Sequence, residues 1–250
     1  GRVENVSVQN ITAINATTPI FINLGKRAKY QGDYREPRAG ILRGVTILNM
    51  LAEGAHVCSS IVGQPEQPVE EVRIENLCVQ YAVPEPFVFR RQAERKAVRS
   101  KEFLTRPVTL TEVPELPDAY PKPVMFGPLP ASAFFLRHAD GVILHDIQID
   151  RQPRDARPMV AADRVCKLAC ERLHSDALPR PGSFLWLLNV QNAIVTHCSA
   201  PPGAEAFLLL QGTKSGNLRI AANDTSRALR VVDTRGDVPE NILSTHHLRK

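Results

Sequence analysis

The chain has 250 residues, of which 43% are hydrophobic and 23% are charged, and its formal net charge is +5. This balance is ordinary for a soluble domain with a well-buried core, and no apolar run approaches the roughly 20 residues that span a bilayer. The N-terminus lacks the apolar segment of a signal peptide, and the dispersed lysines and arginines do not predict a nucleic-acid-binding surface.

A six-residue phrase, apolar-x-apolar-x-x-apolar, recurs along the chain from its first strand-like segment onward. The two alternating apolar residues are predicted to point inward from a strand, and the third to re-enter the core after a polar corner. Asparagine suits such a corner because it tolerates the left-handed backbone conformation. Asn10, Asn49 and Asn76 occupy this position, and Asp146 replaces them in the fourth copy. The copies lie at 6–11, 45–50, 72–77 and 142–147, with weaker copies at 168–173, 193–198 and 218–223.

The last four copies follow one another at intervals of about 25 residues. Such a repeat, rich in β-branched residues and without helical periodicity, predicts one coil of a β-solenoid. Second apolar runs lie between the phrases, such as 134–136 and 184–187, and predict a second strand in each coil. A leucine-rich repeat is disfavoured because its leucine signature is absent, and a propeller requires about 40 residues per repeat. We therefore predict an all-β parallel β-helix.

Two long intervals interrupt the repeat, and both are predicted to be loop insertions, at residues 24–40 and 83–130. Loops of this length on a regular scaffold are commonly functional. The β-helix domain is expected to cover residues 1–233, and the pattern is lost in 234–250, which predicts a C-terminal tail or cap.

Metal binding is not predicted, because the five cysteines have no metal-ligand spacing and the pair His246-His247 lacks further ligands. No cofactor motif is present either. The acidic residues at or near coil corners are expected to be solvated rather than catalytic. These are Asp140, Asp146, Asp150 and Asp163.

Several short phrases, in order along the chain, resemble a bacterial branch of the polygalacturonases, glycoside hydrolase family 28. The resemblance rests on residues 1–6, 19–27, 58–63, 68–72, 120–123, 125–131, 137–139 and 222–228. It implies a right-handed, pectin-lyase-like β-helix that is secreted or periplasmic and monomeric. It also implies inverting hydrolysis of an acidic plant-type polysaccharide by clustered aspartates, with no nucleic-acid or membrane partner.

The catalytic motifs of that family are absent from this chain: Asn-Thr-Asp, Asp-Asp, Gly-His-Gly and Arg-Ile-Lys do not occur. No catalytic residue is therefore assigned. The resemblance instead implies that the chain is the C-terminal part of such an enzyme and is inactive alone.

Saccharide contacts are predicted from cations and aromatic rings in the insertions and on the strand that follows. Cations can pair with a uronate carboxylate, and a tyrosine ring can stack on a sugar face. The candidates are Arg27, Tyr30, Tyr120, Lys122, Arg137 and His138.

Two other hypotheses remain open. The chain is a non-catalytic carbohydrate-binding or surface β-helix module, or it is a Ca²⁺-dependent polysaccharide lyase, which the lack of an acidic cluster disfavours.

Overall fold

A computed structural model describes residues 1–27, 39–82, 109–151, 155–176, 178, 182–240 and 242–246. Within these ranges the chain forms strands and a single short 3₁₀ helix. The strands are β1 (Arg2–Ile14), β2 (Phe21–Asn23), β3 (Ile41–Ala55), β4 (Ser59–Val62), β5 (Val69–Tyr81), β6 (Phe134–Asp150), β7 (Val160–Ser175), β8 (Gly182–Leu188), β9 (Gln191–Thr196), β10 (Ala204–Gln211), β11 (Gly216–Ala221), β12 (Ala228–Arg235) and β13 (Leu243–His246), and the 3₁₀ helix is η1 (Leu110–Glu112).

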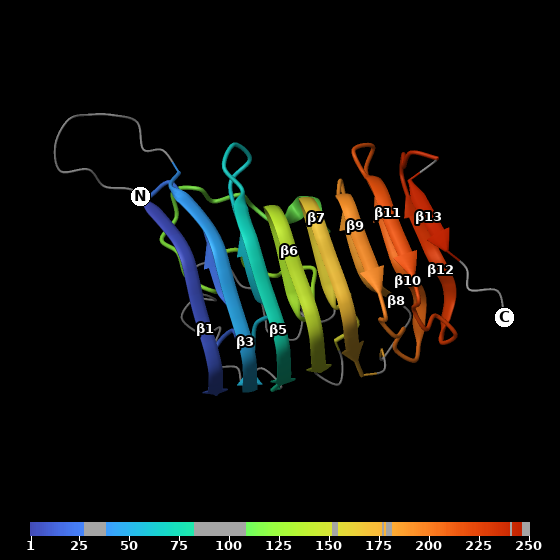
Figure 1. Cartoon of the computed structure of the whole chain (residues 1–250), viewed down its shortest axis with the longest axis horizontal. Helices are drawn as coiled ribbons and strands as arrows, with labels where there is room; N and C mark the ends of the chain where they lie inside the picture. The colour runs from blue at the N-terminus through green and yellow to red at the C-terminus, as the bar shows by residue number, and fades with distance from the viewer. Residues whose placement is uncertain are drawn as a thin grey trace.

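The strands stack into two walls of parallel strands that share β6 and β7. One wall runs β1-β3-β5-β6-β7-β9-β11-β13, and the other runs β2-β4-β6-β7-β8-β10-β12. In Figure 1 the near strands point downward while the chain advances from left to right, with the second wall behind them. The coil is therefore right-handed, and the predicted right-handed parallel β-helix is confirmed.

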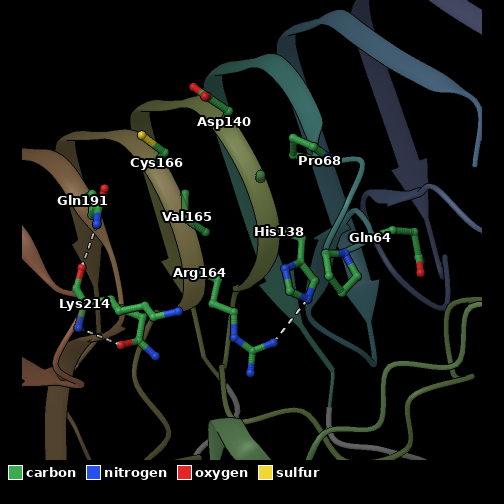
Figure 2. Close-up of a pocket in the computed structure, with 12 residues that line it drawn as sticks. Gln64, Pro68, His138, Asp140, Arg164, Val165, Cys166, Gln191 and Lys214 are labelled. Carbon is green, nitrogen blue, oxygen red and sulfur yellow. Dashed lines mark hydrogen bonds between the residues drawn. The ribbon is translucent and has the colours of Figure 1, made fainter.

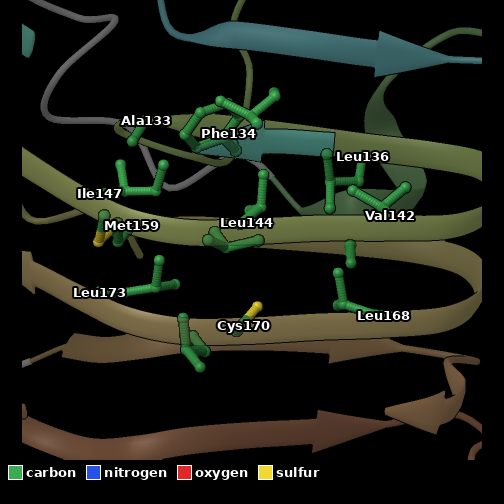
Figure 3. Packing of buried hydrophobic residues seen from close by; sticks show 14 of the residues in the cluster. Ala133, Phe134, Leu136, Val142, Leu144, Ile147, Met159, Leu168, Cys170 and Leu173 are labelled. Atoms are coloured by element: carbon green, nitrogen blue, oxygen red, sulfur yellow. The ribbon is translucent and has the colours of Figure 1, made fainter. Parts of the chain in front are cut away.

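The repeated phrases pair in register, as predicted. Val6 lies opposite Val45, Val45 opposite Val72, and Val72 opposite Val142. These side chains form one inward column, and Val72 and Val142 are fully buried. Figure 3 shows the middle of this core, where Leu144, Leu168 and Cys170 from adjacent coils meet Phe134 and Met159. Because one connected cluster of buried apolar residues extends from Ile20 to Ile242, the core runs continuously along the solenoid.

The polar corners adopt the left-handed conformation expected of them. Asn10, Asn49, Asn76 and Asp146 have φ values between 53° and 56°. Their side chains stack: Asn76 Nδ2 donates to Asn49 Oδ1 at 2.9 Å, and Asn49 Nδ2 donates to Asn10 Oδ1 at 3.0 Å. The same corner is formed by Arg172, His197 and Ala222 in the later coils. The spacing of the repeat therefore locates this corner even where asparagine is absent.

The stretch 234–250, expected to be a tail or cap, continues the solenoid over part of its length. It contains the end of β12, and β13 pairs in parallel with β11, with Leu243 opposite Leu218. The sequence analysis missed this strand because β13 has only four residues, too few to show the repeated phrase.

Candidate functional site

The described part of the second insertion packs over the outer face of the second wall. Residues 109–133 bring Leu110, Val113, Phe126 and Leu129 onto that face, and all four are buried. Their partners project outward from the strands and include Phe135, whose ring centroid lies 6.3 Å from that of Phe126. This apolar layer makes the segment a fixed part of the fold, so the described half of this predicted loop is a cover for the wall.

Arg137 fastens the covering segment to the strands. Its guanidinium donates to Asp163 Oδ2 at 3.0 Å through Nε, to the Val113 carbonyl at 2.7 Å through Nη1, and to the Leu110 carbonyl through Nη2. The residue is only 2% exposed. The geometry therefore places Arg137 in the interior, as a clamp, and not on a saccharide-binding surface as predicted.

Asp163 is completely buried, so the expectation that it lies at a solvated corner is wrong. It sits directly opposite Arg137 in the register between β6 and β7. Burial raises the pKa of Asp163, and the charge of Arg137 opposes that rise. A side chain with no exposed surface cannot reach a polysaccharide, so the role of Asp163 is to compensate the buried charge of Arg137.

Glu115, from the covering segment, lies in one polar cluster with Arg137 and Asp163. Its two carboxylate oxygens both lie 3.1 Å from His138 Nε2, and Arg164 Nη1 lies 3.0 Å from Oε1. Because an ionised carboxylate only accepts hydrogen bonds, Nε2 of His138 carries the proton in this contact. His138 is 6% exposed and has a φ of 47°. Because it contacts Glu115, it too holds the covering segment in place.

Burial alone would raise the pKa of Glu115, but the hydrogen bond from His138 and the charges of His138 and Arg137 outweigh it and lower the pKa. A lowered folded pKa means that the ionised carboxylate stabilises the fold above its ordinary value of 4.5, and that this stabilisation is lost as the pH falls through the folded pKa.

Replacing Glu115 with glutamine should therefore lower the free energy of unfolding at neutral pH, and the difference from the unsubstituted chain should shrink below about pH 4.5. Urea unfolding at a series of pH values measures this. Glu205→Gln is the control, because Glu205 is similarly exposed and lies outside the cluster. A difference that stays constant down to pH 3 would contradict the prediction.

A groove of about 390 Å³ lies beside this cluster (Figure 2). His138, Arg164 and Lys214 face it, together with Asp140 and Gln191. Several of its polar groups already have partners within the chain. Gln191 Nε2 donates to the Lys214 carbonyl, the Lys214 amide donates to Asn189 Oδ1, and Asp140 pairs with Lys167 at 2.9 Å. Among the described residues that line it, there is no tyrosine, tryptophan or phenylalanine on which a sugar ring could stack.

A second hollow of about 390 Å³ lies where the two insertions meet, at the N-terminal end of the solenoid. The Arg27 guanidinium sits 4.8 Å from the ring centroid of Tyr120, and Tyr120 is 65% exposed. The Lys26 amide donates to the Pro117 carbonyl at 2.7 Å, which joins the two insertions. The hollow is lined by Gly1, Asn23, Gly25, Arg27, Gly40, Ala119, Tyr120 and Pro121.

The structure separates the predicted contact residues into two groups. Arg27 and Tyr120, from different insertions, meet in the second hollow, whereas Arg137 and His138 belong to the clamp. Lys122 is exposed but does not line either hollow, and Tyr30 lies outside the described residues.

The sequence analysis assigned no role to Glu115 or Arg164. The sequence did contain one signal for the clamp. In two successive coils a charged residue, Arg137 and then Asp163, follows the second apolar run, and the two residues lie opposite each other between β6 and β7.

Three further observations bear on the site. In the described ranges no group of three or more histidine, cysteine, aspartate or glutamate side chains is arranged to hold a metal ion. No helix among the described residues is long and apolar enough to cross a membrane. Neither a family model nor a curated protein sequence matches the chain.

Proposed function

We propose that this chain is the C-terminal β-helix portion of a glycoside hydrolase that cleaves acidic pectic polysaccharide by inverting hydrolysis, and that it contacts the saccharide in the hollow of Arg27 and Tyr120. The observation that carries the proposal is the guanidinium of Arg27 held over the exposed ring of Tyr120. Both residues were predicted as saccharide contacts from their place in the two insertions, and the fold brings them together.

The chemistry of this pair suits an acidic sugar. A tyrosine ring offers an apolar face to the C–H groups of a pyranose, and a guanidinium can form two parallel hydrogen bonds with a carboxylate. The cation over the ring also orients both side chains before a ligand arrives. Arg27 forms no ion pair with the described residues, so its charge is available to a uronate.

The carboxylates of the clamp and of two coil corners are already engaged within the fold. Inverting hydrolysis needs one carboxyl group to protonate the leaving oxygen and a second, roughly 6.5–9.5 Å away, to activate water. Asp163 is buried, Glu115 is bound by His138 and Arg164, and Asp140 and Asp146 pair with Lys167 and Arg172. These pairings support the proposal that catalysis resides outside this chain.

The same pairings favour a second candidate, a non-catalytic module that binds acidic saccharides. Both functions predict binding by the isolated chain and no hydrolysis. They differ in the longer protein, because only the hydrolase combines this chain with catalytic aspartates. Release of reducing ends from polygalacturonate by the isolated chain would contradict both.

Calorimetric titration with galacturonic acid oligosaccharides tests the shared prediction. Arg27→Gln should weaken binding roughly tenfold or more, since a charge-assisted hydrogen bond contributes about 1.5–3 kcal/mol. Tyr120→Ala should also weaken binding, because it removes the ring on which the sugar stacks. Arg235→Gln is the matched control, because Arg235 is an exposed arginine on β12 far along the solenoid. Methyl-esterified oligosaccharides lack the carboxylate charge and should bind the unsubstituted chain as weakly as Arg27→Gln does. Equal affinity for both ligands would rule out the proposed role of Arg27.

A further inference from the structure

A second left-handed corner of the solenoid lies along the groove beside the clamp. His138, Arg164, Asn189 and Gly212 occupy it in four successive coils, with φ values between 47° and 91°. The residues that precede them pair in register across β6, β7, β8 and β10. Because neighbouring strands are about 4.8 Å apart, the corner places His138, Arg164 and Asn189 in one row, and all three line the groove.

Three side chains in the groove carry hydrogen-bond donors without an acceptor in the described part of the chain. Arg164 binds Glu115 through Nη1 at 3.0 Å, and its Nη2 is left over. Asn189 accepts the Lys214 amide through Oδ1 at 3.2 Å, so its Nδ2 is the free donor. The Lys214 ammonium group is the third, and in Figure 2 its side chain extends toward Arg164.

The groove carries a positive charge that the chain does not compensate. Asp140 is the only acidic residue among the described residues that line it, and Lys167 binds its carboxylate at 2.9 Å. Glu70 lies opposite Asp140 on β5 but does not line the groove. Arg164 has its carboxylate partner in the clamp cluster, whereas Lys214 forms no ion pair within the described ranges. An anion that enters the groove therefore gains a partner for Lys214.

We propose that this groove binds a phosphate group, as inorganic phosphate or as a phosphomonoester, through Arg164, Asn189 and Lys214. The three donors come from β7, from the turn between β8 and β9, and from the turn between β10 and β11. A phosphate group presents at least three acceptor oxygens on different sides, so it can bind donors from all three elements. Guanidinium and ammonium groups both bind phosphate, and about 390 Å³ is enough for a small ligand.

A uronate fits this groove less well than a phosphate. A carboxylate has only two acceptor oxygens, which lie in one plane, and the described lining offers no aromatic ring for the sugar. The site is also separate from the hollow of Arg27 and Tyr120, with which it shares no lining residue among those described. The inference therefore does not depend on the proposed function.

Calorimetric titration of the full chain with inorganic phosphate, at constant ionic strength, tests the site. We expect saturable binding with a Kd of about 1 mM or lower. Lys214→Gln should weaken it roughly tenfold or more, because it removes a charged donor that has no partner in the chain. Lys122→Gln is the matched control and should leave the affinity unchanged, because Lys122 is exposed and does not line the groove.

Asn189→Asp is a second variant of nearly the same shape. It keeps an oxygen that can accept the Lys214 amide, but it replaces the free donor with a carboxylate, so phosphate binding should be lost. Urea unfolding checks that the variant remains folded. Phosphate affinity that is unchanged in both Lys214→Gln and Asn189→Asp would overturn the inference, as would the absence of saturable binding.

Two further ligands define the chemical class. A hexose 6-phosphate that binds more tightly than inorganic phosphate would identify a phosphomonoester as the ligand, and one that binds equally or more weakly would identify the free ion. Acetate should bind at least tenfold more weakly than phosphate, and equal affinity would overturn the assignment to phosphate. Arg27→Gln should keep its phosphate affinity and Lys214→Gln its affinity for galacturonic acid oligosaccharides, so that the two sites are tested separately.

Discussion

Replacing Arg137 with alanine is expected to lower the free energy of unfolding by about 3–5 kcal/mol, the usual effect of removing one partner of a buried ion pair. The substitution leaves the Asp163 carboxylate in a site with no exposed surface and with only the half-exposed Arg164 beside it. It also removes the donors that bind the carbonyls of Leu110 and Val113. The covering segment should therefore loosen along with the loss of stability.

Urea unfolding followed by circular dichroism measures this effect, and hydrogen exchange in residues 109–133 locates it. Arg172→Ala is the matched control, because Arg172 forms a similar pair with Asp146 at 3.3 Å on an exposed corner. Pairs of that kind contribute about 0–1 kcal/mol. An Arg137→Ala variant no less stable than Arg172→Ala would contradict the assignment of Arg137 as a clamp.

Replacing Phe184 with alanine is expected to cost about 3–5 kcal/mol of unfolding free energy. Phe184 lies on β8 and Phe207 on β10, both are fully buried, and their ring centroids are 5.6 Å apart. The substitution leaves a cavity between adjacent coils, and the parallel strands on either side cannot move together to fill it.

Leu229→Ala serves as the comparison for Phe184→Ala, because Leu229 is 82% exposed on β12 and its truncation should change stability by less than about 0.5 kcal/mol. Both variants are measured by urea unfolding at the same pH. Similar losses at the two positions would indicate that the inner space of the solenoid is not packed as described.

The solenoid could be predicted from the sequence because its information is local and repeated. The phrase beginning at Val6 recurs at Val45, Val72 and Val142, and each copy alone indicates two inward residues and a corner. Parallel stacking then follows, since equal phrases bury their apolar residues only when they lie in register. The structure confirms this register.

The clamp could not be predicted in the same way, because its partners come from unrelated segments. Arg137 and His138 are near-neighbours of an apolar run, and nothing in their local pattern indicates whether they face solvent or a covering segment. That choice depends on Leu110, Val113 and Glu115, which reach them from an insertion without any repeat. In contrast, the meeting of Arg27 and Tyr120 brings together two residues that the sequence analysis had assigned to saccharide contact.

The left-handed corners make the coil a modular unit. Asn192 and Asn217 occupy the same corner of adjacent coils, 25 residues apart, and their side chains are joined by a hydrogen bond of 2.7 Å. Removing or duplicating one complete interval between such corners keeps every inward residue inward. Adding one residue within a strand instead turns the side chains that follow it in that strand to the opposite face. The scaffold is thus suited to change its length in whole coils, by duplication or by design, while its ends and its covering segment remain intact.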